Sequence, residues 1–266
     1  MNNKIGFIGA GNMATVIING LIINNYNSNN IYVFDIDDTK SKQFINKGIF
    51  ACKDIIELVK MSDIVFLCVK PQNFPVIIND LMQGDKNKIF VSIAAGITTN
   101  YIKTGTGVNS KVIRTMPNTP MLLGVGATAL CRTQEVSDDD FNVVMNIFKL
   151  LGIAVEIKEE QMNSVISVNA SSPAYIYLFM DAMIKGAVEL GIDEVIAKEL
   201  ICQTLIGSAM MFKNSEKSPS ELIKMVASKG GTTIEALKVL DDNNFSKIIV
   251  NAMKACAKKA NEIGVK

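Results

Sequence analysis

A glycine turn close to the start of the chain constrains the fold more than any other feature. The pattern Gly9-x-Gly11-x-x-Ala14 follows an apolar run and precedes a stretch with the apolar spacing of a helix. In such a strand-to-helix unit the glycines allow a tight turn and close approach of the backbone to a pyrophosphate, while free N–H groups at the helix start face the anion. The pattern predicts a dinucleotide site formed by Ile8, Gly9, Ala10, Gly11, Asn12 and Met13.

Composition narrows the classes of partner. The chain has 266 residues, 48% of them hydrophobic, which is enough for two domains with a sizeable core. Its 27 basic and 26 acidic residues give a net charge of +1, so there is no electrostatic reason to expect nucleic acid or an anionic membrane surface. No continuous apolar run approaches the roughly 18 residues of a membrane-spanning helix. We therefore expect a small-molecule partner, with no nucleic acid and no membrane.

The absence of histidine and the pattern of cysteines limit the kinds of catalysis and metal binding that the chain can support. The sequence contains no histidine, which excludes histidine general-base catalysis and most zinc sites, and it predicts no metal site. The five cysteines are odd in number and scattered, without a C-x-x-C pair, and the chain begins without a signal-like segment. These features indicate a reduced, cytoplasmic protein whose chemistry comes from a cofactor, a hydroxyl, a carboxylate or a lysine.

An acidic residue follows the second predicted strand. The run 31–34 ends at Asp35, about twenty residues beyond the glycine turn, where a carboxylate can accept hydrogen bonds from both ribose hydroxyls of an adenosine. Asp37 and Asp38 follow, and no arginine lies nearby to receive a 2′-phosphate. The pattern favours NADH over NADPH. A solvated turn with an incidental aspartate is the alternative.

Small or rigid residues follow three later strands. The nearly continuous apolar run 63–69 is typical of a parallel strand covered on both faces, and 89–93 and 111–116 predict two more strands. Ligands of open α/β sheets bind at the carboxyl ends of the strands. We therefore expect the residues after these strands to line one cofactor cleft, although each segment also fits ordinary turn chemistry. They are Val69, Lys70 and Pro71, then Ala94, Ala95 and Gly96, and finally Asn118.

The order of predicted elements indicates two domains. Further strands at 124–130 and 154–157 bring the count to about eight, which predicts a doubly wound α/β domain over residues 1–160. After residue 160 the strand signals stop, and 161–266 are expected to form an all-helical domain. Its long helices carry more apolar residues than one small domain can bury, which favours a homo-oligomeric interface.

A second glycine pair lies in the helical half. Gly230 and Gly231 precede Thr232 and Glu235, which are spaced as a capping box. This pattern predicts a flexible approach to a helix start whose free N–H groups can bind a small carboxylate. The hydroxyl of Thr233 could hydrogen-bond the same ligand. A glycine C-cap followed by an ordinary capped helix is an equally good interpretation of the spacing.

Six segments in one order along the chain resemble the Δ1-pyrroline-5-carboxylate reductase family. They read FIGAGNMA (7–14), VKP (69–71), SIAAG (92–96), MPNTP (116–120), SSPAY (171–175) and GGTTI (230–234). The first is common to many dehydrogenases, whereas the last two are specific to this family. The resemblance implies an N-terminal Rossmann domain and a C-terminal dimerisation domain that interlocks with a second subunit, with dimers often assembling into larger rings.

The resemblance also implies the activity, which is reduction of L-1-pyrroline-5-carboxylate to L-proline by hydride transfer from NAD(P)H, the last step of proline biosynthesis. Thr233 would be the catalytic residue, with its hydroxyl meeting the imine nitrogen opposite the nicotinamide, and the partner chain would supply this loop. Lys229 stands where the family usually has proline, and Ala170 where glycine is commoner. The residues implied to bind the substrate are Ser228, Gly230, Gly231, Thr232 and Thr233.

Two other functions compete with this interpretation. β-Hydroxyacid dehydrogenases and imine reductases have a similar first domain, but the former place a catalytic lysine early in the first interdomain helix, and residues 161–183 contain no lysine. A protein that binds the dinucleotide only to sense it or to scaffold a complex would keep the glycine turn. It would have no need of the second glycine pair.

Overall fold

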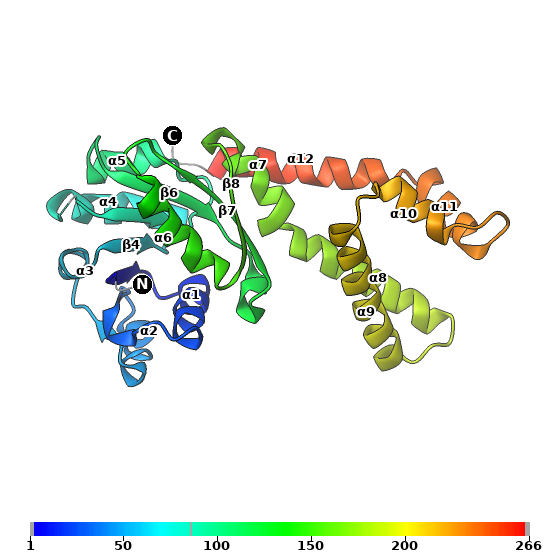
Figure 1. The fold of residues 1–266 in the computed structure, drawn as a ribbon, viewed down its shortest axis with the longest axis horizontal. Helices are drawn as coiled ribbons and strands as arrows, with labels where there is room; N and C mark the ends of the chain where they lie inside the picture. Colours follow the sequence, from blue (N-terminus) through cyan, green and yellow to red (C-terminus); the bar gives the residue numbers. More distant parts are fainter. Residues whose placement is uncertain (1–2, 86, 264–266) are drawn as a thin grey trace. The chain divides into compact units, whose positions relative to one another are not determined.

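The first part of the chain forms one eight-stranded sheet in the computed structural model, which describes residues 3–85 and 87–263 (Figure 1). The strand order is β3-β2-β1-β4-β5-β6-β7-β8, and only the β6–β7 pairing is antiparallel. The first six strands follow the order of the doubly wound dinucleotide fold, so the predicted fold class is confirmed. The strands are β1 (Ile5–Ile8), β2 (Ile31–Phe34), β3 (Phe50–Ala51), β4 (Ile64–Leu67), β5 (Ile89–Ser92), β6 (Lys111–Met116), β7 (Gly126–Arg132) and β8 (Gly152–Glu156).

The central strands are almost continuously apolar, as suits strands whose two faces are both covered. Every residue of β1, β4 and β5 is buried. Phe7 and Phe66 are paired in register on neighbouring strands, and their rings stack with centroids 4.9 Å apart. Such cross-strand aromatic pairs add to the stability gained by burial alone.

Helices cover both faces of this sheet (Figure 1). Apolar residues of α1 and α6 form one core with the sheet, and those of α3, α4 and α5 form a second core on the opposite face. Side chains that accept first-turn N–H groups begin α2, α3, α5 and α6, namely Asp37, Asp54, Thr98 and Ser137. The helices are α1 (Asn12–Ile23), α2 (Asp38–Lys42), α3 (Ile55–Met61), α4 (Phe74–Gln83), α5 (Thr99–Thr106) and α6 (Asp138–Lys149).

The segment that follows the sheet packs against it. Helix α7 (Met162–Val165) continues into one π-helical turn, Ile166–Ala170, and both contribute to a small core beside β6 and β7. Residues 1–173 and 255–266 form one compact unit, and residues 174–254 form a second.

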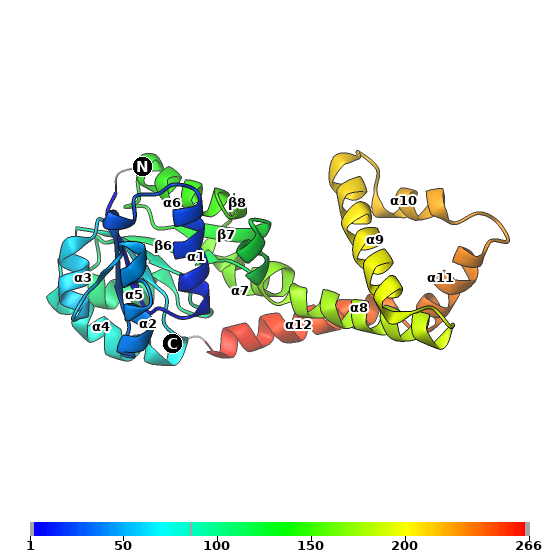
Figure 2. The same cartoon turned by 90° about the horizontal axis from the view of Figure 1, so that it is seen from below.

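The second unit consists entirely of helices joined by loops (Figure 2). Two of these helices have ends in the first unit: α8 begins there and α12 ends there. Asp193 caps α9, and Ser218 with Glu221 forms a capping box at α10. The helices are α8 (Ser172–Glu189), α9 (Glu194–Asn214), α10 (Pro219–Val226), α11 (Thr232–Asp242) and α12 (Phe245–Ile263).

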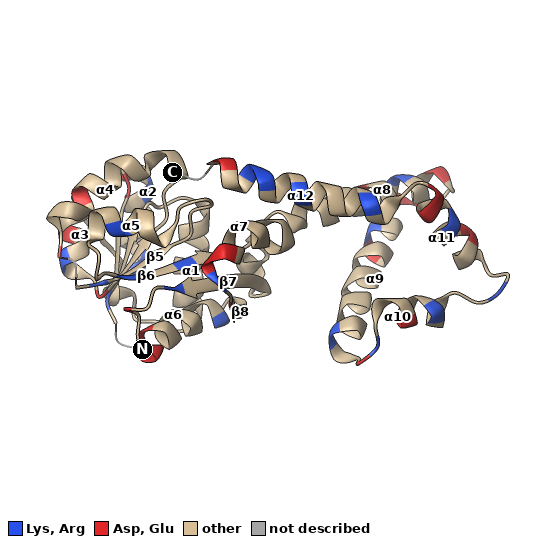
Figure 3. Ribbon diagram, turned by 90° about the horizontal axis from the view of Figure 1, so that it is seen from above, with Lys and Arg blue, Asp and Glu red and all other residues tan. Residues whose placement is uncertain are grey.

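Large apolar side chains lie exposed throughout the second unit. Leu190 is 83% exposed, Val195 72%, and Met210, Met211 and Phe212 each more than half. Charged residues are sparse on α8 and α9 (Figure 3). Helix α9 is long and apolar enough to cross a membrane by length and composition, although no continuous apolar run in the sequence suggested one. A single helix of this kind is weak evidence for a membrane, and covering by another protein surface explains the same composition.

Candidate active site

The carboxyl ends of the central strands meet along one edge of the sheet. Phe34, Ile8, Leu67 and Ser92 are paired in register across β2, β1, β4 and β5. The residues that follow them therefore emerge side by side. The chain reverses its direction of strand addition between β1 and β4, which is where open α/β sheets bind their ligands.

The two glycines of the turn have different structural roles. Gly9 has φ +96°, and a Cβ there would lie 2.8 Å from the carbonyl oxygen of Cys68, so the backbone itself requires glycine. Gly11 has φ −74°, which any residue adopts, and a Cβ there would meet nothing within 4 Å. Packing does not explain Gly11, whereas the close approach of a pyrophosphate does.

Helix α1 begins without a side-chain cap. Gly11 is its N-cap residue and supplies no side-chain acceptor. In an α-helix the first N–H groups have no intrahelical partner, so those of Asn12 and Met13 are directed out of the helix start. Together with the open space beside Gly11, this arrangement fits a pyrophosphate group.

Asp35 is hydrogen-bonded to the glycine turn, a contact that sequence reasoning missed. Its Oδ2 accepts the N–H of Ala10 at 2.7 Å, and its Oδ1 accepts the N–H of Asp37 at 2.9 Å. A carboxylate has about four acceptor positions, so each oxygen can still accept from a ribose hydroxyl. Hydrogen bonds from Thr39 lower the pKa of Asp37 below its ordinary value, which keeps a second negative charge near this position.

The other predicted cofactor residues also follow strands of the same sheet. Val69 and Lys70 lie between β4 and a 3₁₀ turn that begins at Pro71. After β5, the N–H of Ala94 donates to Ser92 Oγ at 3.2 Å, and Gly96 takes φ +76°. Ala95 lies between them and is partly buried against the small core beside β6. Because these residues are small, a ligand at the carboxyl-end edge of the sheet can approach the backbone closely.

The side chain of Asn118 makes most of its hydrogen bonds within the protein. It is only 8% exposed, its Oδ1 accepts the N–H of Ala127 at 2.8 Å, and its Nδ2 donates to the carbonyl of Asn169 at 3.1 Å. Asn169 in turn donates from Nδ2 to the carbonyls of Met116 and Ala127, at 2.7 and 2.9 Å. One N–H of the Asn118 amide therefore remains to meet a ligand. The sequence offered no signal for Asn169, whose partners are more than 40 residues away.

The predicted substrate residues lie in the loop between α10 and α11 and in the first turn of α11, and this loop extends beyond both helices (Figure 2). Gly230 has φ +75°, and the N–H of Gly231 donates to the carbonyl of Ser228 at 2.9 Å. A Cβ on Gly231 would lie 2.6 Å from Ser228 Oγ, so this tight turn favours glycine at both positions.

The predicted capping box at Thr232 and Glu235 is wrong. Gly231, in an extended conformation, is the N-cap residue, so Thr232 is already the first residue of α11. Glycine is a fair N-cap because its backbone reaches the required conformation freely. Among the described residues no side chain caps α11, so the N–H groups of Thr232 and Thr233 stay available to an external acceptor.

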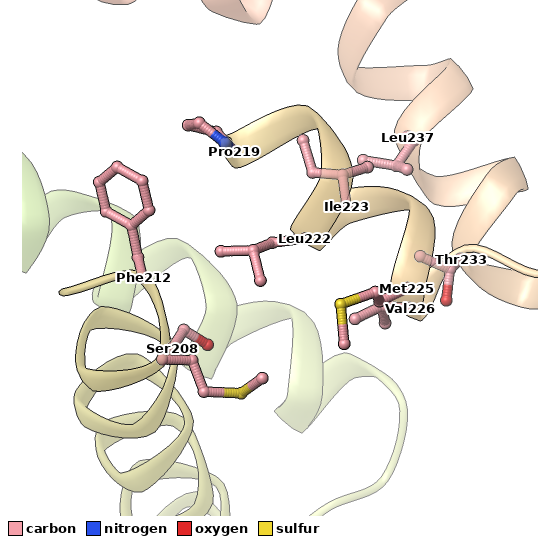
Figure 4. Close-up of a pocket in the computed structure, with 10 residues that line it drawn as sticks. Ser208, Phe212, Pro219, Leu222, Ile223, Met225, Val226, Thr233 and Leu237 are labelled. Carbon is pink, nitrogen blue, oxygen red and sulfur yellow. The ribbon is translucent and has the colours of Figure 1, made fainter. Parts of the chain in front are cut away.

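An apolar pocket of about 530 Å³ lies between α9, α10 and α11 (Figure 4). Thr233 lies at one end of it, beside Met225 and Val226. The remaining lining is mainly aliphatic and aromatic, with Phe212 and Leu222 among its members. Such a lining suits an apolar side chain from another surface rather than a charged substrate.

The predicted cofactor residues all lie in the first compact unit, and the predicted substrate residues all lie in the second. No His, Cys, Asp or Glu cluster of three or more that could hold a metal ion occurs in the described ranges 3–85 and 87–263. Each group includes a glycine N-cap residue, Gly11 at α1 and Gly231 at α11.

Comparison with known proteins identifies relatives along the whole chain. A family model described as pyrroline-5-carboxylate reductase dimerisation matches residues 159–263, and one described as NADP oxidoreductase, coenzyme F420-dependent, matches residues 4–96. The pyrroline-5-carboxylate reductase of Escherichia coli is 36% identical over 266 residues, with 99% of each chain covered. That of Haemophilus influenzae is 35% identical, with 97% of each chain covered.

Solved structures give the same result. A pyrroline-5-carboxylate reductase from Coxiella burnetii has a TM-score of 0.91 at 34% identity and covers 100% of both chains. A pyrroline carboxylate reductase from Plasmodium falciparum, solved with NADP bound, has a TM-score of 0.91 at 29% identity and covers 99% of both chains.

The two glycines of the turn should respond differently to substitution. Gly11→Ala should raise the dissociation constant for NADH at least about tenfold, because the new methyl group occupies the space that the pyrophosphate needs. It should leave the unfolding temperature within about 2 °C of the wild type, because the site is open and the backbone suits alanine. Fluorescence titration and thermal unfolding measure the two quantities.

Gly9→Ala is the matched comparison. It should lower the unfolding temperature, because alanine is strained at positive φ and meets the Cys68 carbonyl. A Gly11→Ala protein that binds NADH as tightly as the wild type would show that this turn does not contact the dinucleotide.

Proposed function

The chain belongs to the pyrroline-5-carboxylate reductase family, and we propose on that basis that it reduces L-1-pyrroline-5-carboxylate to L-proline with NAD(P)H. The observation that carries the proposal is the presence of two helix starts without side-chain caps, α1 and α11, at the two motifs where this reaction needs anion sites. One suits a pyrophosphate and the other a small carboxylate.

The first unit would bind the cofactor through its own backbone and Asp35. The N–H groups at the start of α1 would hold the pyrophosphate beside Gly11, and the Asp35 carboxylate would accept from the adenosine ribose. Val69, Lys70 and residues 94–96 would line the nicotinamide half of the cofactor site. When bound, the reduced nicotinamide supplies the hydride that reaches C5 of the imine.

The second unit would bind the substrate through α11. The N–H groups of Thr232 and Thr233, with Ser228 and the two glycines of the loop, would hold the carboxylate at the positive end of the helix dipole. The Thr233 hydroxyl would orient the ring nitrogen. An iminium accepts hydride better than a neutral imine, and with no histidine in the chain the nitrogen arrives protonated or takes its proton from solvent.

We further propose that one active site is made by two chains. The region matched to the dimerisation model, 159–263, contains the whole substrate loop. Helix α9 has exposed apolar residues, and an apolar pocket lies beside Thr233. Together they provide the apolar surface that an obligate interface with a second copy of the chain needs. A ring of such dimers is the larger assembly that the resemblance implies. The same interface would cover α9 without a membrane.

We make three further proposals, on the domain boundary, the location in the cell and the absence of a nucleic-acid partner. We place the boundary between the dinucleotide-binding and helical domains at residue 160, supported by the start of the matched dimerisation region at 159. We propose a cytoplasmic location, supported by five cysteines that are all free. The balanced net charge supports the absence of a nucleic-acid partner.

Removal of the Thr233 hydroxyl should impair catalysis. Thr233→Ala should lower kcat/KM for pyrroline-5-carboxylate by something on the order of 10²-fold, because a positioning or proton-relay hydrogen bond to the nitrogen is lost. Thr233→Ser keeps the hydroxyl and should retain most of the activity. Steady-state oxidation of NADH measures both variants. Unchanged kinetics of the alanine variant would refute this role.

Asp35 should set the cofactor preference. We expect kcat/KM to be at least about tenfold higher with NADH than with NADPH, because a 2′-phosphate would lie against this carboxylate. Asp35→Ser should reduce the preference, whereas Asp38→Ser, at an exposed side chain paired with Lys42, should not. A clear preference of the wild type for NADPH would contradict the argument from Asp35.

A further inference from the structure

We propose that Glu159 is a positioning residue for the nicotinamide half of the cofactor site. Its carboxylate holds the end of the segment that follows β5, the segment whose small residues face the cofactor edge. The inference rests on the proposed function only in requiring that the chain bind a nicotinamide dinucleotide.

The carboxylate of Glu159 makes two hydrogen bonds to Thr99. Its Oε1 accepts the backbone N–H of Thr99 at 2.8 Å, and its Oε2 accepts the Thr99 hydroxyl. Thr99 is the first residue of α5, so the negative charge of a residue sixty positions later in the chain lies at the positive end of this helix. Hydrogen bonds to a charged acceptor are stronger than those between neutral groups.

The cofactor-facing segment is therefore held at both ends. At its beginning, the N–H of Ala94 donates to the Ser92 side chain. At its end, Thr99 is held by Glu159, and Thr99 is itself 2% exposed. Ala95 and Gly96 between these points have no side-chain hydrogen-bonding groups of their own, and the buried Ile97 packs in the core on one face of the sheet. The Glu159 contact adds a polar anchor to this packing at the end of the segment.

A buried arginine supports the carboxylate. Arg114, on β6, is 1% exposed, and its Nη1 lies 3.9 Å from Glu159 Oε1. Its Nη2 donates to Asn163 Oδ1, and Asn163 donates to Asn261 on α12 at 2.7 Å. Burial lowers the pKa of Arg114, but the nearby carboxylate opposes that effect. A buried cation needs such a counter-charge, so Glu159 is fixed from both sides.

The effect should be confined to one half of the dinucleotide. In a doubly wound fold the strands β1 to β3 serve the adenosine half and β4 to β6 serve the nicotinamide half. The segment held by Glu159 follows β5. Loosening this segment should weaken the binding of NADH. ADP lacks the nicotinamide half and should bind with unchanged affinity.

The test compares Glu159→Gln with Glu160→Gln in the full-length protein. The control removes the same charge at the next residue, which is exposed and makes no hydrogen bond or ion pair within the described ranges. Fluorescence or calorimetric titration should give a dissociation constant for NADH about tenfold higher for Glu159→Gln, with that for ADP unchanged within about twofold. Glu160→Gln should match the wild type for both ligands.

A second variant protects the test against a folding defect. Thr99→Val keeps the shape of the side chain and the backbone N–H but loses the hydroxyl contact with Glu159. It should raise the dissociation constant for NADH as well, by a smaller factor. Equal NADH affinity in Glu159→Gln and the wild type would overturn the proposal, and so would equal weakening of NADH and ADP. Wild-type protein that binds NADH without reducing pyrroline-5-carboxylate would refute the proposed reaction while leaving this test intact.

Discussion

The candidate site depends on two helix starts, those of α1 and α11, whose N–H groups no side chain caps. Most helices of the sheet domain are capped by an aspartate, serine or threonine, so their first N–H groups are satisfied within the protein. Helices α1 and α11 begin instead at Gly11 and Gly231, which have no side chain to offer. An unsatisfied helix start is costly if it is buried and useful if an anion completes it. In the proposed reaction, one such start would bind the cofactor and the other the substrate.

The elements that sequence predicts well are those fixed by local patterns. Continuous apolar strands, the glycine turn and Asp35 all occupy the places that their spacing indicated, because backbone sterics and burial act over a few residues. The start of α11 was predicted one position too late, since threonine with a glutamate three residues later imitates a capping box, and Gly231 took the cap instead. The interpretation of the second glycine pair as an anion site does not depend on that box.

The contacts that sequence could not predict join distant parts of the chain. Glu159 and Thr99 are sixty residues apart, and nothing in the local sequence distinguishes Glu159 from its neighbour Glu160. Asn169 likewise reaches Met116 and Ala127 only because the π-helical turn packs on the end of β6. Such contacts follow from tertiary packing and not from periodicity. Glu159 would in this way set the position of the backbone that follows β5.

We propose that the helix starts of α1 and α11 contribute to one active site from two different chains. Equal amounts of Gly11→Ala and Thr233→Ala proteins, unfolded together and refolded, measure it directly. With shared sites, each mixed dimer contains one site with two intact halves and one with neither. In assays with NADH well below the dissociation constant of the Gly11→Ala protein, where each variant alone retains about a tenth of the activity or less, random pairing should restore about a quarter of the wild-type activity. Recovery near that level supports the account. A refolded mixture no more active than the two variants assayed separately would contradict it.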